Sequence, residues 1–131
     1  MNTETLEIVI KKSHSDKYGH VNYKKYLDIF ALGQDDCAKK HGIDFGEIER
    51  VYGLRSVIRK MNIEYVGEVF PFEVVHIKTW VEKVGNSSFT YGQKILRGEQ
   101  VVTLFLTTVV MINKSNKPTS IPQSIRSKLL P

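Results

Sequence analysis

The sequence predicts an α+β fold in which one long central helix is wrapped by a five-stranded antiparallel sheet. Three observations predict this fold. One long stretch has helical periodicity, strand-like stretches lie on both sides of it, and short turn signals separate the later strands. Such a sheet has only that helix against which to bury a face, so the helix must lie against it.

The first expected element is a strand over residues 5–12, TLEIVIKK, where apolar and polar side chains alternate. After a polar loop, apolar side chains recur every three or four residues from Asn22 to about His41, which predicts a helix. Gly42 stands where such a helix ends. The apolar positions of the helix are Tyr23, Tyr26, Leu27, Phe30, Cys37 and Ala38. Their spread around the helix favours burial over a place on the surface.

Four further strands are expected after a short connector, over residues 54–66, 72–84, 88–96 and 101–112. The turn signals between them are Gly67 with Pro71, Gly85-Asn86 and Gly98-Glu99. The last strand, VVTLFLTTVVMI, is apolar on both faces, which predicts a place inside the sheet with both sides covered. The tail is expected to be a loop that ends in a short helix.

Length and composition predict one globular domain over residues 1–131, with 41% hydrophobic and 25% charged residues. No apolar run is long enough to cross a bilayer, and the N-terminal residues do not resemble a signal peptide. Cys37 is the only cysteine, so no disulfide can form within the chain. We therefore expect a cytoplasmic protein with no membrane partner.

The formal net charge of +5 is compatible with an anionic ligand. Lysine and arginine are mixed with acidic residues from end to end, however, and no nucleic-acid recognition motif accompanies them. We therefore expect no nucleic-acid partner.

The loop before the helix, HSDKYGHVNYKKY, holds the residues with the clearest chemical potential. A carboxylate such as Asp16 can act as nucleophile or base, and the first free N–H groups of a helix can bind an oxyanion. Gly19 allows a tight turn, so the Asp16 carboxylate and the Tyr23 backbone N–H could face one substrate. The alternative is that Asp16 and Asn22 only cap turns and the helix start.

The same loop resembles D-x-x-G-H-V-N-N-x-x-Y, the segment that marks hotdog-fold acyl-CoA thioesterases of the 4-hydroxybenzoyl-CoA thioesterase-like family. The matching residues are Asp16, Gly19, His20, Val21, Asn22 and Tyr26. The segments GNSSFTYGQKILRGEQVV and NKSNKPTSIPQSIR resemble the family's hairpin of strands three and four and its closing loop. The chain departs from the pattern at His14, where many members have an acid, at Tyr23 and at Ala31. Ala31 replaces a helical Glu, which weakens any mechanism with that Glu as nucleophile.

The resemblance implies hydrolysis of an acyl-CoA or acyl-carrier-protein thioester to a free acid and a thiol, without a cofactor. It implies that Asp16 is nucleophile or general base and that the Tyr23 N–H binds the oxyanion, in a site shared between the subunits of a homodimer or homotetramer. His20 and Asn22 are further catalytic candidates, although His20 could equally make a structural hydrogen bond. The expected substrate-binding residues are Tyr18, Gly19, Phe30, Ser87 and Ser88, the last two beside pantetheine.

Other functions stay open at this point. A non-catalytic hotdog module could bind an acyl thioester or a partner protein, whereas hydratase chemistry would need the pattern G-D-x-N-P-x-H, which is absent. Cys37 and His41 have the spacing of a helical pair, although packing explains them more simply. His14, Asp16 and His20 have no recognised metal-ligand spacing, so no metal is expected. Candidates for the phosphates of CoA, by residue type alone, are Arg55, Arg59, Lys60, Lys83 and Arg97. The acyl group and the choice between CoA and carrier protein are not determined by the sequence.

Overall fold

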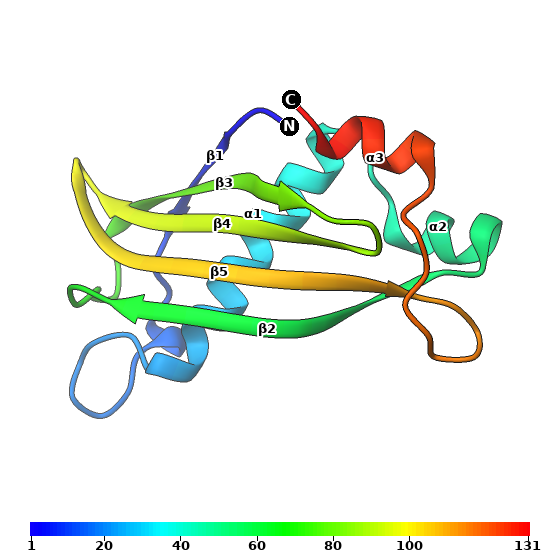
Figure 1. Cartoon of the computed structure of the whole chain (residues 1–131). Helices are drawn as coiled ribbons and strands as arrows, with labels where there is room; N and C mark the ends of the chain where they lie inside the picture. The colour runs from blue at the N-terminus through cyan, green and yellow to red at the C-terminus, as the bar shows by residue number, and fades with distance from the viewer.

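The computed structural model describes residues 1–131 and shows a curved antiparallel sheet around one long helix (Figure 1). The strands are β1 (Glu4–Val9), β2 (Arg55–Tyr65), β3 (Val74–Val84), β4 (Ser88–Arg97) and β5 (Gln100–Ile112). They are ordered β1-β3-β4-β5-β2, and every neighbouring pair is antiparallel. The predicted fold class is confirmed, and β5 lies inside the sheet as predicted. The expectation that both of its faces are covered is wrong within one chain, because Leu104 and Leu106 are exposed on the face opposite the core.

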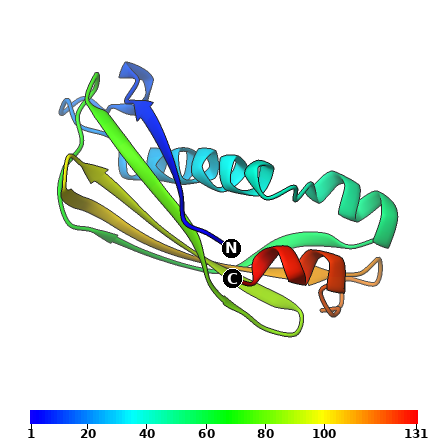
Figure 2. The same cartoon turned by 90° about the horizontal axis from the view of Figure 1, so that it is seen from above.

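The long helix α1 (Tyr26–Lys40) lies along the concave face of the sheet (Figure 2). It packs against β1, β3 and β4, so β2 at the opposite edge has less cover. Its regular α-helical part begins later than predicted because residues 23–25 form a separate 3₁₀ turn, η2. The helix ends one residue before His41, and Gly42 follows with a φ of 68°.

The short connector predicted after α1 is wrong in one respect, because it contains a second helix, α2 (Phe45–Tyr52). The Asp44 side chain accepts a hydrogen bond from the Glu47 N–H at its start, and Gly53 ends it in the left-handed conformation. Its apolar residues do have helical spacing, but eight residues are too few to distinguish a helix from a connector in the sequence. The predicted C-terminal helix is present as α3 (Gln123–Leu129).

Two predicted strands begin or end elsewhere because tight turns replace their ends. β1 ends at Val9, and residues 12–14 form a 3₁₀ turn, η1. β3 begins at Val74 because the preceding residues turn at Phe72, which has a φ of 70°.

The core consists of two clusters at opposite ends of the sheet. The first core cluster contains Ile10, Val21, Tyr26, Ile29, Phe30, Val69, Val75, Ile77, Ile95, Val102 and Phe105. The second contains Ala38, Ile43, Ile48, Leu54, Phe89, Tyr91, Val109, Met111, Ile121, Ile125 and Leu129. We call the end with the first cluster and the loop 11–25 the site end, and the end with α2, α3 and the β3–β4 turn the far end (Figure 1).

A polar layer separates the two clusters. On α1 and on three strands, one polar residue lies between a residue of one cluster and a residue packed in the other: Gln34, Thr79, Gln93 and Thr107. The buried Gln93 amide donates to the Phe30 carbonyl at 2.9 Å and to Thr79 Oγ1 at 3.0 Å. Gln34 Nε2 donates to Gln93 Oε1 at 2.9 Å. These bonds join α1 to the middle of the sheet.

Candidate active site

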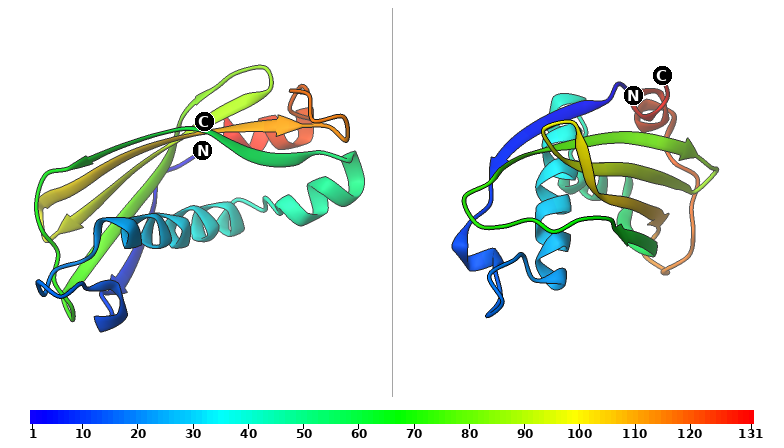
Figure 3. Two further views of the ribbon diagram at one scale, coloured as in Figure 1. Left: turned by 90° about the horizontal axis from the view of Figure 1, so that it is seen from below. Right: turned by 90° about the vertical axis from the view of Figure 1, so that its left-hand side faces the viewer.

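The loop 11–25 lies beside the loop 66–73 at the site end (Figure 3, right). Backbone hydrogen bonds join the two loops. The Val21 N–H donates to the Val69 carbonyl at 2.8 Å, and the Phe72 N–H donates to the Ile10 carbonyl at 2.7 Å. The candidate site is therefore built from two loops that support each other.

Asp16 lies in a tightly closed turn within the first loop. Its N–H donates to the His20 carbonyl at 3.0 Å, and the Gly19 N–H donates to the Asp16 carbonyl at 3.1 Å. Gly19 has a φ of 85°, which glycine adopts at little cost. Ser15 and Val21 form a β-bridge just outside this turn. The turn holds the Asp16 side chain at a fixed point.

The two oxygens of the Asp16 carboxylate have different surroundings. Oδ1 accepts a hydrogen bond from the Tyr18 N–H at 2.8 Å, so Asp16 does stabilise the turn. Oδ2 accepts no hydrogen bond and lies 4.0 Å from His20 Nδ1. The side chain is 20% exposed. One oxygen therefore has a structural contact, while the other is available for chemistry.

His20 is not hydrogen-bonded to Asp16. Its Nδ1 lies 3.2 Å from the Val21 carbonyl, which assigns the Nδ1 proton to that bond and leaves Nε2 as an acceptor. The ring is stacked on Tyr18, with centroids 6.3 Å apart. The geometry favours a role for His20 in orienting the loop or a water molecule, rather than a direct hydrogen bond with the Asp16 carboxylate.

The backbone N–H of Tyr23 has no hydrogen-bond acceptor within the chain. Asn22 caps the η2 turn, because its side chain accepts a hydrogen bond from the Lys24 N–H at 3.0 Å. The Tyr65 hydroxyl on β2 donates to the Tyr23 carbonyl at 3.1 Å, which ties the turn to the sheet. The first N–H of the helical segment is thus held in place and unpaired, as an oxyanion site requires.

A small cavity of about 190 Å³ opens at this point. Its lining residues are Asp16, His20, Val21, Tyr23, Tyr26, Tyr65, Gly67 and Glu68. Ligand pockets for drug-sized molecules are generally about 300 Å³ or larger, so the cavity suits a thioester group rather than a whole acyl-CoA. Glu68 was not anticipated, because a lone Glu in a predicted turn carries no chemical signal in the sequence.

Several residues expected near the substrate lie elsewhere. Phe30 is fully buried and packs on Phe105 with ring centroids 4.3 Å apart, so it belongs to the first core cluster and does not line the cavity. Tyr18 is exposed beside the cavity's His20 but is not part of the lining. Ser87 and Ser88 flank the β3–β4 turn at the far end (Figure 1). One chain does not bring these two serines to Asp16, because the length of the sheet separates them.

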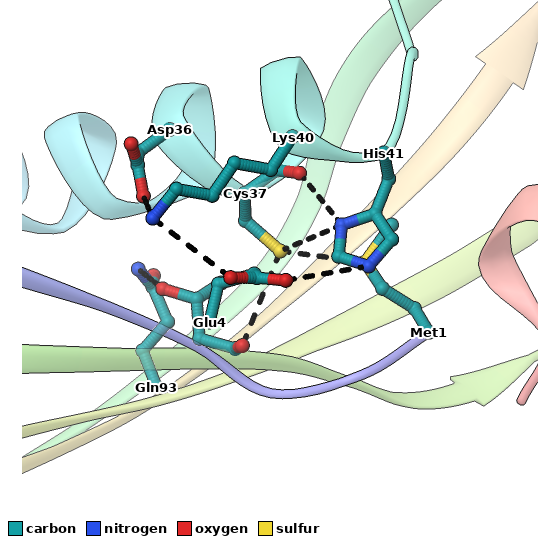
Figure 4. Close-up of polar contacts among 8 residues, drawn as sticks. Met1, Glu4, Asp36, Cys37, Lys40, His41 and Gln93 are labelled. Carbon is teal, nitrogen blue, oxygen red and sulfur yellow. Dashed lines mark hydrogen bonds and ion pairs between the residues drawn. The ribbon is translucent and has the colours of Figure 1, made fainter.

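Cys37 and His41 meet inside the molecule, between α1 and the sheet (Figure 4). Cys37 Sγ lies 3.9 Å from His41 Nδ1, but this nitrogen is only 2.9 Å from the Cys37 carbonyl, to which it donates. Burial, together with the nearby carboxylates of Glu4 and Asp36, raises the pKa of the Cys37 thiol to about 11. A buried and protonated thiol fits packing and argues against a nucleophile.

No group of three or more His, Cys, Asp or Glu side chains is arranged to hold a metal ion. His14 does not face Asp16 as a ligand, because its Nδ1 accepts a hydrogen bond from the Lys11 N–H at 3.1 Å. Burial and the charge of Lys11 lower the pKa of His14. None of the helices combines the length and apolar character needed to cross a bilayer.

Comparisons with known proteins agree with this fold. The model of the thioesterase-like superfamily matches residues 11–129. A 1,4-dihydroxy-2-naphthoyl-CoA thioesterase from Synechocystis superposes with a TM-score of 0.90 at 15% identity, covering 98% of this chain and 96% of that one. A DHNA-CoA thioesterase from Staphylococcus aureus gives 0.86 at 25% identity, covering 97% and 86%. A 4-hydroxybenzoyl-CoA thioesterase variant in complex with 4-hydroxybenzoyl-CoA gives 0.87 at 16% identity, covering 98% and 99%.

Proposed function

Because the chain belongs to the thioesterase-like superfamily and has the hotdog fold, we propose that it hydrolyses an acyl-CoA or acyl-carrier-protein thioester at the Asp16 loop. One observation carries the proposal. A carboxylate oxygen without a hydrogen bond, Asp16 Oδ2, and an unpaired backbone N–H, that of Tyr23, belong to residues lining one small cavity.

In the proposed reaction the thioester carbonyl enters this cavity, with its oxygen at the Tyr23 N–H. Asp16 Oδ2 either attacks the carbonyl carbon or removes a proton from an attacking water. In both cases negative charge develops on the carbonyl oxygen, where the N–H stabilises it. The carbon–sulfur bond then breaks and a thiolate leaves. It becomes the free thiol by taking the proton that Asp16 removed from water or, if Asp16 attacks directly, a proton from solvent. If Asp16 attacks directly, water hydrolyses the resulting anhydride and releases the acid.

The proposal includes a homodimer, because the cavity beside Asp16 within one chain has room only for a thioester group. β2 is an edge strand, and the exposed apolar side chains of Ile58 and Met61 lie on it. Two copies joined along β2 by a two-fold axis run antiparallel, which brings the far end of one chain to the site end of the other. The far end carries a hollow of about 530 Å³ that includes Arg50, Arg55 and Lys114, cations suited to the phosphates of CoA.

The central test is the change Asp16→Asn. It keeps the size of the side chain and the Oδ1 contact with Tyr18, but it removes the charge. We expect turnover of acyl-CoA substrates to fall by roughly a hundredfold or more, with the fold intact by circular dichroism. The matched control is Asp28→Asn in the first turn of α1, whose carboxylate is exposed and makes only a 4.0 Å contact with Lys25. It should stay within about twofold of the wild type.

The same preparations distinguish the second candidate, a non-catalytic module that binds an acyl thioester. The departures at His14 and Ala31 from the family pattern favour that candidate. If the wild type binds acyl-CoA but releases no thiol from short, long or aromatic acyl-CoAs, the hydrolase proposal fails. If the wild type is active and Asp16→Asn is equally active, Asp16 is only a turn residue.

Sedimentation tests the dimer independently of activity. We expect at least a dimer at micromolar concentration, and Met61→Lys should shift the protein towards monomer by placing a charge on the proposed interface. A wild-type monomer at that concentration would contradict the shared site.

A further inference from the structure

A second feature of the site end is unrelated to the hydrolysis of a thioester. Residues 70–73 form a type II turn, in which the Glu73 N–H approaches the Phe70 carbonyl at 3.3 Å. The third residue of such a turn needs a positive φ and is generally glycine. Here it is Phe72, with a φ of 70° and 73% of its surface exposed. A large aromatic side chain is therefore held in solvent by a strained backbone.

The strained turn is braced on several sides. Glu73 Oε1 accepts a hydrogen bond from the Phe70 N–H at 2.7 Å, and Arg97 Nη1 lies 3.3 Å from both Glu73 oxygens. Arg97 also donates to the Glu68 carbonyl at 2.7 Å. Because the surrounding contacts enforce an unfavourable conformation, the presentation of Phe72 points to a function for this turn.

Other apolar side chains lie next to Phe72. Phe70 is 41% exposed in the same turn, and Val9 and Val74 are exposed and directly opposite each other in the β1–β3 register. We call Val9, Phe70, Phe72 and Val74 the apolar tip. These four side chains are too few for a stable protein interface, which needs about 800 Å² on each partner.

The basic charge of the protein is concentrated beside this tip. Residues 11–25 contain five lysines and one carboxylate, whereas the rest of the chain has 14 basic and 13 acidic side chains. Nearly all of the net charge of +5 therefore belongs to the loop that contacts the turn at Ile10. Lys25 makes one 4.0 Å contact with Asp28, and the other four lysines have no carboxylate within 4.0 Å. Of the acids in the loop 66–73, Glu73 is paired with Arg97 and Glu68 is exposed.

We propose that the site end docks reversibly onto an anionic phospholipid surface. Phe70 and Phe72 enter the boundary between headgroups and acyl chains, and the lysines of the loop 11–25 face the lipid phosphates. The sequence predicts no membrane partner because no segment can span a bilayer, but surface docking requires no spanning segment. The proposal goes beyond thioester hydrolysis and does not depend on it.

The test is co-sedimentation of the full chain with phosphatidylcholine vesicles that contain or lack phosphatidylglycerol. We expect binding to the anionic vesicles, weak binding to the neutral ones, and release at high salt. Phe72→Gly should weaken binding roughly tenfold, because an inserted aromatic side chain is lost. The same change should raise the melting temperature by a few degrees, since glycine favours this φ. Phe70→Ser provides a second variant, whose backbone is not strained.

Matched controls lie outside the tip. Leu32→Ser removes an exposed apolar side chain from the middle of α1, and Lys114→Glu reverses a charge at the far end. Leu32→Ser should bind vesicles as the wild type does, and Lys114→Glu should weaken binding less than Lys12→Glu. The proposal is overturned if the wild type does not bind anionic vesicles, or if Phe72→Gly and Phe70→Ser both bind them as tightly as the wild type does. Saturable binding of an acidic carrier protein that Phe72→Gly weakens, without vesicle binding, would overturn it and assign the tip to a protein.

Discussion

The two ends of the same sheet differ in where their unpaired polar groups lie. At the far end the unpaired Tyr91 hydroxyl is buried in the second core cluster, whereas Asp16 and Tyr23, which carry unpaired groups at the site end, line a cavity. At the far end, Asp44 caps α2, Lys128 Nζ donates to the Gly42 carbonyl at 2.8 Å, and Arg126 donates to the Asn86 carbonyl at 2.8 Å. At the site end, the Tyr23 N–H and Asp16 Oδ2 lack hydrogen-bond partners. The site end also has the strained Phe72 and nearly all of the net charge.

The difference indicates that the far end contributes mainly to stability and the site end mainly to binding. Unpaired polar groups and strained turns cost free energy, so they persist only where the remaining structure supplies enough stability. The second core cluster, closed by α2 and α3, supplies part of that stability at the far end. The hydrogen bonds of the polar layer around Gln93 lie between the two ends. Variants in this layer and at each end test whether the stability of one end depends on the other.

Gly33→Ala should have the largest effect on stability, because it acts on both ends. A Cβ at this position would lie 2.8 Å from Gln93 Nε2 and 2.9 Å from Thr79 Oγ1. We expect the free energy of unfolding to fall by about 3 kcal/mol through overpacking, which outweighs the gain of about 1 kcal/mol in helix propensity. Denaturant unfolding measures the loss.

Gly46→Ala is the matched control for Gly33, since its Cβ would meet only a side-chain oxygen of Asp44, at 3.3 Å. It should change stability by less than about 1 kcal/mol. Hydrogen exchange of Gly33→Ala should show faster exchange at both ends. Faster exchange at one end alone would mean that the polar layer does not couple them.

Cys37→Ala should have an intermediate effect, confined to stability. The thiol is buried between α1 and the sheet, so its loss should cost about 1–2 kcal/mol, while turnover stays within a few-fold of the wild type. Thermal unfolding and a thioesterase assay on one preparation measure both quantities. Loss of turnover in a folded Cys37→Ala protein would move the chemistry away from the Asp16 loop.

Ser88→Ala should have the smallest effect and tests whether the far end of a partner completes the site. If the Ser88 hydroxyl bonds pantetheine, its removal should raise KM by roughly two- to fivefold and leave kcat unchanged. Ser87→Ala is expected to behave similarly, and Ser127→Ala, at an exposed position of α3, serves as the control. An unchanged KM in both variants would remove these serines from the site.

The elements and the local part of the site could be predicted because both depend on short-range patterns. The strands and α1 have clear periodicity, and Asp16 and Tyr23 are only seven residues apart, with Gly19 between them. The helix α2 was missed because its eight residues make only about two turns, although their apolar positions have helical spacing.

Other features depend on how distant segments meet. Phe30 was expected at a pocket because an aromatic side chain can line an acyl group, with a place in the core as the alternative. Only the packed sheet shows that it belongs to the core. Ser87 and Ser88 lie at the far end because the β3–β4 hairpin runs the length of the sheet. No residue pattern predicts that Phe72 adopts a positive φ, since Arg97, which contacts the neighbouring Glu73, comes from β4 in a separate part of the chain.

The hydrogen bonds of Gln93 also restrict how the chain can fold. Apolar contacts alone would let α1 slide along the concave sheet by one turn, about 5.4 Å, because leucine, isoleucine and phenylalanine side chains tolerate many neighbours. In a shifted register the Gln93 amide would face a different carbonyl, and Gly33 would no longer lie over it, so a buried amide would lack partners. The polar layer thus selects one alignment of helix and sheet. This alignment sets the position of the η2 turn, and with it the distance between the Tyr23 N–H and Asp16.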